Sequence, residues 1–474
     1  MTAPLSQPPA SAHLPPDDPA RAAAELLPSG ASEMSIDDAL GLAVRMHRQD
    51  RLEGATQIYR RILQAVPGHP DAMALLGMAE HQMGRSDEGV ALVRAAIQRA
   101  PGFAGFQVNL GNMLSESGRL DEARQAYERA RELEPGRADT LNNLGVLYQA
   151  LRRHDEARAS FERAIELDPG HVRAWNNLGI LLDVLGQPQE SVRAYLKAVD
   201  LSPGHAGSIF LLGMTFYNLG QLDKATQVFK HWMEREPDNP RPAHLYAACS
   251  GQAVPKRAPD AYVEAEFDGF ARSFERVLTE RLEYRAPQLC ADLLASRLGE
   301  PKAALDVLDV GCGTGLCGPL VAPWARRLVG VDLSSGMLSK ARGKGVYDEL
   351  VKAELTGFLQ GTPSAWDAAV CADTLCYFGD LGEVMQATAA ALRPGAPMVY
   401  TVEAQDDDTS SEARIQPNGR YVHGRAHLER TAAAAGLELL HAERQPLRIE
   451  GRSEVQGWLV AVARPAATAA RQTP

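Results

Sequence analysis

The chain of 474 residues is 45% hydrophobic and 23% charged, with a formal net charge of −11. This balance excludes a wholly disordered protein, and the length is enough for two or three domains with sizeable cores. Because no block of lysine and arginine stands out, nucleic acid is not an expected partner.

The spacing of the cysteines and the length of the apolar runs indicate the cellular compartment of the protein. All six cysteines lie in the second half of the chain and no two form a C-x-x-C pair, so they fit neither a zinc site nor a disulfide framework. No uninterrupted apolar run approaches the roughly 18 residues of a membrane-spanning helix. The first residues lack the basic and apolar regions of a secretory signal. We therefore expect a cytoplasmic protein with reduced thiols, no membrane span and no metal.

Residues 1–33 are rich in proline, alanine and serine and contain few large apolar side chains. Such a segment cannot bury enough apolar surface to offset the entropy lost on ordering, so we expect a disordered tail. A second, shorter tail is expected at residues 467–474.

A repeat occupies residues 36–240. Prolines recur in steps of 34 residues, at positions 67, 101, 135, 169, 203 and 237. Leucine–glycine pairs share this period and begin at positions 76, 110, 144, 178 and 212. An aromatic residue shares it too, at positions 59, 127, 161, 195 and 229, with Val93 in the one remaining slot.

This pattern resembles the tetratricopeptide repeat, in about six copies. Small residues let two helices approach closely, the aromatic residue fills the space between them, and proline ends the second helix. Each helix pair leaves an apolar face that the next pair covers, so the resemblance implies a superhelix with a concave binding surface. Asparagines on the first helices are candidates for holding a peptide there, or else are interhelix or solvent residues: Asn109, Asn142, Asn143, Asn176 and Asn177.

Residues 241–300, after the repeat, are expected to form a linker and a helical cap. Two prolines make residues 253–259 typical of a linker. Residues 261–298 are expected to be helical, with large aromatic side chains at mostly three- to five-residue spacing between Tyr262 and Phe274. This helix either packs on the next domain through its apolar face or closes over a ligand pocket.

Apolar strands alternate with helical segments over residues 301–466, which predicts a parallel sheet with helices on both faces. The expected strands are 305–310, 327–332, 347–355, 367–373 and 397–403, followed by a final pair at 437–443 and 457–463. A helix is expected near residues 427–435. The fold class is therefore multidomain, with an all-α repeat array followed by an α/β domain.

The first strand of this domain ends in a glycine turn, G-x-G-x-G at positions 311–315, and a helix is expected to begin near Leu316. Glycines let the backbone approach a ligand closely, and a helix N-terminus favours a negative group. The second strand ends in Asp332, where a ribose diol would be held. Leu316 stands where a dinucleotide fingerprint needs its third glycine, so a nicotinamide cofactor is disfavoured.

These features resemble motif I and the acidic loop of class I S-adenosylmethionine-dependent methyltransferases, over roughly residues 260–465. The resemblance implies a Rossmann-like fold and S-adenosylmethionine as the cofactor. The cofactor-binding residues that it implies are Asp309, Gly311, Cys312, Gly313, Gly315, Asp332, Leu333, Met337, Glu354, Leu355 and Asp373. Members of the family also carry a segment similar to Phe267–Phe274, and this resemblance is the basis for the alternative in which the helix closes over the ligand; packing on the next domain stays the default interpretation.

Each of these residues takes an expected role from the resemblance. The glycines and Cys312 would wrap the methionine end, and Asp309 would organise their loop or meet the amino group. Asp332 would accept hydrogen bonds from both ribose hydroxyls. Leu333 and Met337 would pack on the adenine, and two residues would lie at its other edge: Glu354, where the family often has aspartate, and Leu355.

Asp373, with Thr374 and Leu375, follows the fourth strand at the edge where such sheets bind ligands. Methyl transfer from a sulfonium depends mainly on positioning, so no shared catalytic signature is expected. The candidate catalytic residues are Asp373, Tyr377 and His423, with Glu403 and Tyr421 as further candidates for contacting the methyl acceptor.

His423 and Arg448, towards the C-terminus, are polar residues whose default role is structural or solvent-exposed. His423 precedes His427 by four residues, but Gly424 stands where a zinc protease has its glutamate, so a surface or hydrogen-bonded histidine is expected. Arg448 falls between the last two expected strands and could meet an acidic substrate, but by default it is expected to be solvated.

Together the two resemblances imply a tetratricopeptide-repeat protein fused to a methyltransferase domain, of a type found in bacteria. We expect a methyltransferase whose repeats recruit a protein or peptide. Two alternatives stay open: a scaffold whose cofactor domain no longer transfers methyl groups, and a small-molecule methyltransferase that uses the repeats for assembly. The methyl acceptor and the oligomeric state do not follow from the sequence.

Overall fold

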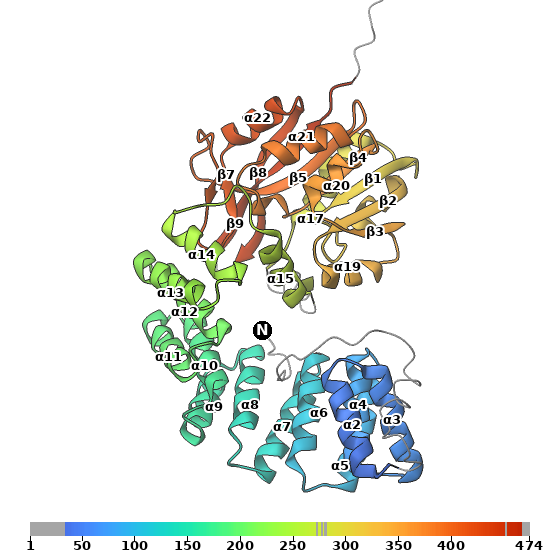
Figure 1. Ribbon diagram of the computed structural model, residues 1–474, viewed down its shortest axis with the longest axis vertical. Coiled ribbons are helices and arrows are strands. Elements are labelled where there is room, and N and C mark those ends of the chain that lie inside the picture. Colours follow the sequence, from blue (N-terminus) through green and yellow to red (C-terminus); the bar gives the residue numbers. More distant parts are fainter. Residues whose placement is uncertain (1–33, 272–273, 276–277, 279–281, 451–452, 467–474) are drawn as a thin grey trace, which may run out of the picture. The chain divides into compact units, whose positions relative to one another are not determined.

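The computed structural model describes residues 34–271, 274–275, 278, 282–450 and 453–466, so the two expected tails lie outside the described residues (Figure 1). Contacts divide the chain into two compact units, Met1–Thr215 and Phe216–Pro474. The division falls inside helix α12 (Ala206–Asn218), within the last repeat. The domain bounds expected from the sequence stay predictions.

Unit 1 consists of helix pairs that keep the 34-residue period. The first helices of the pairs are α2 (Ile36–Arg48), α4 (Pro70–Gln82), α6 (Ala104–Glu116), α8 (Ala138–Ala150) and α10 (Val172–Val184). The second helices are α3 (Leu52–Ala65), α5 (Ser86–Arg99), α7 (Leu120–Leu133), α9 (His154–Leu167) and α11 (Pro188–Leu201). From α4 to α12 the first helices begin at residues 70, 104, 138, 172 and 206, which confirms the predicted repeat.

A glycine on the first helix lets the aromatic residue of the second helix pack against its backbone. A Cβ added at Gly145 would lie 2.5 Å from the ring of Phe161, and one added at Gly179 would lie 2.5 Å from the ring of Tyr195. Both aromatic side chains are fully buried. The glycine and the aromatic residue recur together in the sequence because the packed helix pair has no room for a larger side chain.

Unit 2 begins with three described helices that precede the sheet domain and a fourth that packs on it. These are α13 (Leu222–Arg235), α14 (Pro240–Ser250), α15 (Asp260–Phe270) and α17 (Ala286–Leu298). The single helix expected over residues 261–298 is wrong, because residues 282–285 are not helical. The Arg285 N–H instead donates to the Leu447 carbonyl of a strand at 2.8 Å. Pro287 then occupies the first turn of α17, where its missing N–H is not needed.

The strands of the α/β domain are β1 (Leu305–Val310), β2 (Ala325–Asp332), β3 (Glu349–Lys352), β4 (Ala368–Cys371), β5 (Pro397–Ala404), β6 (Arg414–Ile415), β7 (Tyr421–His423), β8 (Glu438–Glu450) and β9 (Ser453–Ala463). They form one sheet in the order β3-β2-β1-β4-β5-β7-β6, and β9 lies antiparallel to β5 and β8. The pairs from β3 to β5 are parallel. The predicted parallel sheet and its seven strands are confirmed, while β6 and β7 are too short to leave a pattern in the sequence.

The helices of this domain after α17 are α18 (Gly318–Val321), α19 (Ser335–Arg342), α20 (Leu355–Gln360), α21 (Gly382–Ala391) and α22 (Arg425–Ala434), with two 3-10 helices, η1 (Ala322–Trp324) and η2 (Leu375–Tyr377). Leu308 and Val310 of β1 pack into a core with α20, α21 and α22. Val307 packs into a second core with α17 and α18 on the opposite face. Strands buried on both faces are largely apolar, which accounts for the apolar runs in the sequence; β1 departs from this at Asp306 and Asp309.

The helix after the glycine turn is shorter and later than predicted. It begins at Gly318 rather than near Leu316, and α18 comprises four residues before η1. Pro319 and Pro323 lack the N–H groups that a longer helix needs. Because so short a helix has a small dipole, the favourable geometry at this edge comes mainly from the turn itself.

The cysteines form no disulfide. All six are free thiols, and five are buried. None of the described helices is long and apolar enough to cross a membrane. The cytoplasmic location stays a prediction.

Candidate active site

The carboxyl ends of β1 and β4 mark the point where the order of the sheet reverses. β2 lies on one side of β1 and β4 on the other, so the connections leave β1 and β4 in opposite directions. Sheets of this kind bind ligands in the crevice outside the carboxyl ends at such a point. Three segments reach this edge: the glycine turn after β1, the loop after β2 and the loop after β4.

The three glycines of the turn all have positive φ angles, of 69° at Gly311, 53° at Gly313 and 84° at Gly315. An added Cβ at Gly311 would lie 2.3 Å from Oγ1 of Thr374, and one at Gly315 would lie 2.9 Å from the ring of Tyr347. A Cβ at Gly313 would meet no atom within 4 Å. Gly311 and Gly315 are therefore required by packing, while Gly313 borders open space on the side available to a ligand.

Asp332, at the end of β2, is joined to the glycine turn. Its Oδ2 accepts a hydrogen bond from the Gly313 N–H at 2.9 Å, and its Oδ1 accepts one from the Ser334 N–H at 2.8 Å. Burial raises the pKa of Asp332 above its ordinary value. Each carboxylate oxygen keeps a second lone pair, so the group can still accept hydrogen bonds from two hydroxyls.

Asp309 lies beneath the turn and is almost completely buried. Tyr347 donates a hydrogen bond from its hydroxyl to Oδ2 of Asp309 at 2.6 Å, and the Tyr347 ring packs against Gly315 and Gly318. Burial raises the pKa of Asp309 to about 7. Of its two expected roles, this position favours organising the loop over meeting a ligand amino group.

The residues expected beside an adenine differ in exposure. Leu333 is half-buried, whereas Met337 and Leu355 are buried, as is Cys312 in the turn. Glu354 caps α20, because its two carboxylate oxygens accept hydrogen bonds from the N–H groups of residues 356 and 357 at 3.0 and 2.8 Å. Glu354 thus has a structural role at the start of this helix, whether or not it also borders a ligand.

Helix α15 lies across the same edge of the sheet. Oδ1 of Asp268 accepts hydrogen bonds from the Ser334 hydroxyl at 2.5 Å and the Gly336 N–H at 2.9 Å, in the loop after β2. The Phe267 ring meets Tyr377, in the loop after β4, edge to face with 5.6 Å between ring centroids. One helix therefore contacts the loops on both sides of the glycine turn, which favours the interpretation of a helix that closes over the ligand.

A buried cluster of charges joins the ends of β4, β5 and β8. Arg448 pairs through Nη1 with Asp373 at 2.5 Å, through Nε with Glu450 at 2.7 Å, and through Nη2 with Glu403. Arg420 pairs with Glu403 at 2.7 Å and with Glu450 at 2.9 Å. The expectation of a solvated Arg448 is wrong, since its side chain is 4% exposed. Burial raises the pKa of Glu403 to about 7 and also raises that of Asp373.

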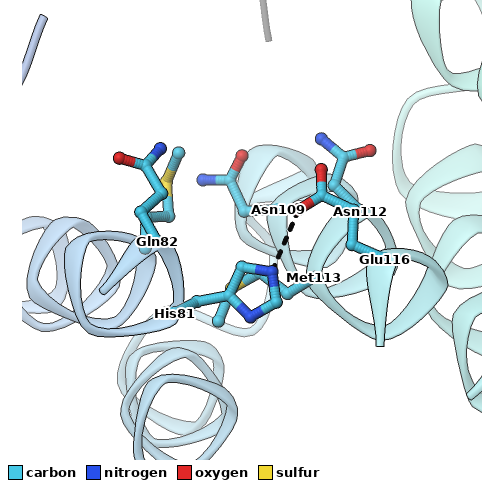
Figure 2. A pocket seen from close by; sticks show the side chains of 7 residues that line it. His81, Gln82, Asn109, Asn112, Met113 and Glu116 are labelled. Carbon is cyan, nitrogen blue, oxygen red and sulfur yellow. Dashed lines mark hydrogen bonds and ion pairs between the residues drawn. The ribbon is translucent and has the colours of Figure 1, made fainter. Parts of the chain in front are cut away.

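The repeat array of unit 1 contains a separate pocket between two successive first helices. Its lining residues come from α4 (Met78, His81 and Gln82) and from α6 (Asn109, Asn112, Met113 and Glu116). Figure 2 shows the His81 ring bonded to the Glu116 carboxylate, with a distance of 3.0 Å between Nε2 and Oε2. Amide groups and methionines surround this hydrogen bond, and the space of about 10 Å³ that they leave is room for about one water molecule.

The asparagines expected in the repeat groove fall into two groups. Asn109 lines the pocket. The other four bond to polar side chains of neighbouring repeats: Asn143 to Asn112 at 3.2 Å, Asn177 to Asn142 at 2.8 Å, and Asn176 to Ser208 at 2.8 Å. Since Asn142 and Asn176 are buried, the interhelix interpretation holds for these two.

Comparison with known proteins agrees with this architecture. A family model described as a methyltransferase domain matches residues 282–442, and tetratricopeptide-repeat models match residues 46–110, 103–170, 142–206 and 184–249. The chain joins tetratricopeptide repeats to a methyltransferase domain.

The methyltransferase domain has relatives of several kinds. It is 44% identical over 86 residues to human methyltransferase-like protein 27, covering 18% of this chain and 34% of the relative. It is 30% identical over 156 residues to a ubiquinone biosynthesis O-methyltransferase of Thiobacillus denitrificans, covering 29% of this chain and 66% of the relative. The chain thus spans between a third and two thirds of the length of these two relatives.

The repeats are also similar to those of solved structures. A crystal structure of MamA is 24% identical to this chain with a TM-score of 0.32, and the match covers 37% of this chain and 98% of MamA. The helical-repeat fold of unit 1 rests on its own helix pairs and on the matching repeat models.

The segment expected to be a linker is hydrogen-bonded to the methyltransferase domain. The Lys256 carbonyl accepts from the N–H groups of Gly379 and Asp380 at 2.8 and 2.7 Å, and the Ala258 N–H donates to the Tyr377 carbonyl at 2.7 Å. The segment is therefore docked, because its backbone pairs with the loop after β4. Composition alone could not reveal this pairing, since proline-rich segments look alike whether free or docked.

The preceding helix α14 is held to the same domain. Nε2 of His244 is 2.8 Å from the Gly419 carbonyl, and the His244 ring lies 4.4 Å from that of Tyr262 on α15. Both His244 and Tyr262 are buried. Helix α14, at the end of the last repeat, thus contacts the helix that crosses the candidate site.

The candidate catalytic residues differ in how well they fit that role. His423 is fully buried, and burial lowers its pKa to about 3, so it is a weak proton acceptor at neutral pH. Burial raises the pKa of Tyr377 well above its ordinary value, so its phenol stays protonated. Tyr421 donates a hydrogen bond from its hydroxyl to the Pro255 carbonyl at 2.7 Å, so this side chain has a structural role. Asp373 is the carboxylate among the three candidates and lies directly after β4.

Sequence reasoning missed Tyr347, Arg420 and Glu450. Tyr347 acts on Asp309 from 38 positions away, and no motif spacing connects the two. The described residues also contain no group of three or more side chains placed to bind a metal ion.

Proposed function

We propose that this protein is an S-adenosylmethionine-dependent methyltransferase whose repeats recruit a protein or peptide. One observation carries the cofactor assignment. The turn after β1 has three glycines with positive φ, and the N–H of the middle one is bonded to the carboxylate that ends β2. Gly313 follows β1 at the point where the sheet order reverses, and Asp332 reaches it from the end of the neighbouring strand β2; this class of sheet binds its ligand there.

The residues present fit the cofactor. Gly313, which has open space at its Cβ position, would allow the methionine end to approach the backbone. Asp332 would bind the ribose hydroxyls through its free lone pairs, and Asp309 would support the turn through Tyr347. Leu333, Met337, Glu354 and Leu355 stay the proposed adenine neighbours. Bound S-adenosylmethionine supplies a methyl group activated by a sulfonium.

A small-molecule methyltransferase is the second candidate, and one observation favours it. Helix α15 contacts the loops after both β2 and β4, and such a cover suits a small acceptor better than an extended chain. A relative named as a ubiquinone biosynthesis O-methyltransferase is consistent with this alternative. The stacked repeats of unit 1 support the recruitment of a partner instead, because such arrays present an extended binding surface.

Calorimetric titration of the full-length protein with S-adenosylmethionine and with NAD tests the cofactor proposal. We expect micromolar binding of S-adenosylmethionine and no binding of NAD. Binding of NAD alone would replace the proposal with a nicotinamide enzyme. Binding of neither would favour a scaffold and direct attention to the repeats.

Recruitment is tested separately in the repeat array. A pull-down with the full-length protein is compared with one using Asn109→Ala, which alters a residue on helix α6 of the repeat array. We expect the wild-type protein to capture a partner that the Asn109→Ala variant does not capture. Identical capture by both proteins would contradict a role for this residue.

A further inference from the structure

Asp268 is an exposed carboxylate on α15 that bonds to the loop after β2. Its Oδ1 accepts hydrogen bonds from the Ser334 hydroxyl at 2.5 Å and from the Gly336 N–H at 2.9 Å, 66 and 68 positions later in the chain. Desolvation opposes ionisation, but these two hydrogen bonds leave the pKa of Asp268 below its ordinary value. An exposed carboxylate is ordinarily solvated, so two specific bonds to an ionised group indicate that α15 is held against this loop.

Ser334 connects Asp268 to Asp332. It is completely buried, and its N–H donates to Oδ1 of Asp332 at 2.8 Å. The Ser334 hydroxyl, which donates to Asp268, also accepts a hydrogen bond from the Met337 N–H at 3.0 Å at the start of α19. Because both the hydroxyl and the N–H of Ser334 are engaged, the position of Asp332 depends on the contact that Asp268 makes.

The contact between α15 and this loop is close because residue 336 is a glycine. A Cβ added at Gly336 would lie 3.0 Å from Cβ of Ala271 and 3.2 Å from Oδ1 of Asp268. The φ angle of Gly336 lies outside the left-handed region, so it is the close approach of α15 that disfavours a side chain there. The glycine therefore lets Asp268 reach the backbone of the loop.

Helix α14 contacts α15 through two pairs of side chains. Arg241 of α14 pairs with Glu266 of α15 at 2.7 Å, and the rings of His244 and Tyr262 lie 4.4 Å apart. Nε2 of His244 also lies 2.8 Å from the Gly419 carbonyl of the methyltransferase domain. Because His244 and Tyr262 are buried, moving α14 away would expose apolar surface. Helix α15 is therefore held by α14 as well as by the loop after β2.

Helix α14 also belongs to the repeat pattern. It begins at residue 240, which is 34 residues after the start of α12 at residue 206, and a tetratricopeptide-repeat model extends to residue 249. Its Ala248 has the register of Met78 and Asn112, which line the pocket of unit 1. Ala248 instead packs with Ile415 and Tyr421 of the methyltransferase domain. The first helix of a further, incomplete repeat is thus part of the support of the candidate site.

We propose that Asp268 is a positioning residue for cofactor binding, which holds Asp332 through Ser334, and that α14 keeps α15 where Asp268 makes this contact. The proposal rests on the proposed methyltransferase function. It adds a determinant of cofactor affinity outside the glycine turn and the strand ends, and it makes a helix of the repeat array part of that determinant. The exposure of Asp268 suits a cover that opens to admit its ligand, since water can replace each of its two bonds.

The ribose hydroxyls provide a readout that a merely structural role would not move. Two ligands are titrated into the full-length protein in a calorimeter: S-adenosylhomocysteine, the demethylated form of the cofactor, and its 2′,3′-dideoxy analogue, which lacks the hydroxyls that Asp332 would bind. The wild-type protein should prefer the first ligand by about 10- to 100-fold, the contribution of hydrogen bonds to a charged acceptor. Because Asp268 acts on the hydroxyl contacts, its substitution should affect the first ligand alone.

Asp268→Ala removes both bonds to the loop. We expect it to weaken S-adenosylhomocysteine binding by about 3- to 10-fold, the net contribution of one hydrogen bond, and to leave binding of the dideoxy analogue unchanged. Asp268→Asn keeps the accepting Oδ1 and should restore most of the affinity. Because Asp268 is exposed, both variants should fold, which urea unfolding checks.

Glu264 provides a matched control on the same helix. Its carboxylate accepts a hydrogen bond from Nζ of Lys352 at 2.6 Å, at the end of β3 rather than in the loop after β2. Glu264→Ala should therefore leave the preference for the ribose hydroxyls unchanged. Gly336→Ala perturbs the contact of Asp268 from the other partner and should lower this preference, as Asp268→Ala does.

His244→Ala tests the contribution of α14. It removes the ring that packs on Tyr262 and the bond to Gly419, so it should also lower the preference for S-adenosylhomocysteine over the dideoxy analogue. Combined with Asp268→Ala, it should lower the preference by less than the product of the two separate effects, since both act on the position of Asp332. Should His244→Ala not fold, Arg241→Met, which removes the ion pair with Glu266, replaces it in this test.

The role of Asp268 is overturned by equal weakening of both ligands in Asp268→Ala, by wild-type affinity for both, or by a comparable loss of preference in Glu264→Ala. An unchanged preference in the folded α14 variant would overturn the role of α14. A wild-type protein that binds both ligands equally would overturn the whole proposal. Absence of binding of S-adenosylmethionine and S-adenosylhomocysteine would instead refute the proposed function, so the two failures are distinguishable.

Discussion

The glycine turn offers a test in which stability and ligand binding separate. Gly311 and Gly313 both have positive φ, but an added Cβ meets Oγ1 of Thr374 at 2.3 Å in the first case and open space in the second. Alanine at either position pays the cost of a left-handed backbone, roughly 1–2 kcal/mol. Only alanine at Gly311 adds a steric overlap, which costs a further 1–3 kcal/mol or so.

We therefore expect Gly311→Ala to destabilise unit 2 by about 2–5 kcal/mol and Gly313→Ala by about 1–2 kcal/mol. For ligand binding, Gly313→Ala should be the more informative of the two variants. Gly313→Ala should stay folded and lose S-adenosylmethionine affinity, because its methyl group occupies the space available to the cofactor.

Urea unfolding followed by circular dichroism measures the first quantity and calorimetric titration measures the second. Unfolding is expected in two steps because the chain has two compact units, and the comparison uses the step assigned to unit 2. Equal destabilisation by the two substitutions would refute the steric argument. Wild-type cofactor affinity in Gly313→Ala would refute the placement of the ligand.

Three further outcomes are expected. Asp332→Ala should abolish tight binding of S-adenosylmethionine while the unfolding step of the repeats stays in place, as measured by calorimetry and circular dichroism; unchanged affinity would show the ribose assignment to be wrong. Burial raises the pKa of Asp309 from its ordinary value near 4 to about 7 in the folded state, so unit 2 should lose stability as the pH rises through that window, at up to about 1.4 kcal/mol per unit. Asp309→Asn should flatten this dependence in urea unfolding at pH 5 and 7.5, and an equally steep dependence in the variant would contradict the assignment. Gly145→Ala should destabilise unit 1 by about 1–3 kcal/mol because its Cβ would meet the Phe161 ring, whereas Gly136→Ala, which meets no atom within 4 Å, should change its urea midpoint little; similar effects of both would contradict the packing argument.

The contacts of α14 and residues 255–258 bear on how the catalytic domain can be studied. His244 bonds to the Gly419 carbonyl, and Lys256 and Ala258 bond to the loop that contains Tyr377. Truncation at the end of the recognisable repeats would remove α14 and expose the buried Tyr262 ring of α15. Experiments on the candidate site therefore need α14 in the protein.

The local parts of the site were predictable from the sequence, because each is encoded within one short segment. The glycine turn, Asp332 and Asp373 follow strands that were predicted at nearly their observed bounds. The function of a strand end depends on the direction of the strand, and strand–helix alternation fixes that direction. What the sequence could not supply was the set of partners around these residues, such as Tyr347 beneath Asp309.

The sequence by itself determined the 34-residue repeat and the α/β domain, since periodic glycine, aromatic and apolar positions act within one helix pair or one strand at a time. Tertiary structure alone decided that Arg448 is buried rather than solvated, because its partners Asp373 and Glu403 lie 75 and 45 positions earlier in the chain. It also decided that the segment expected to be a linker is docked. Burial and charge pairing depend on which distant segments meet, and no local pattern records that.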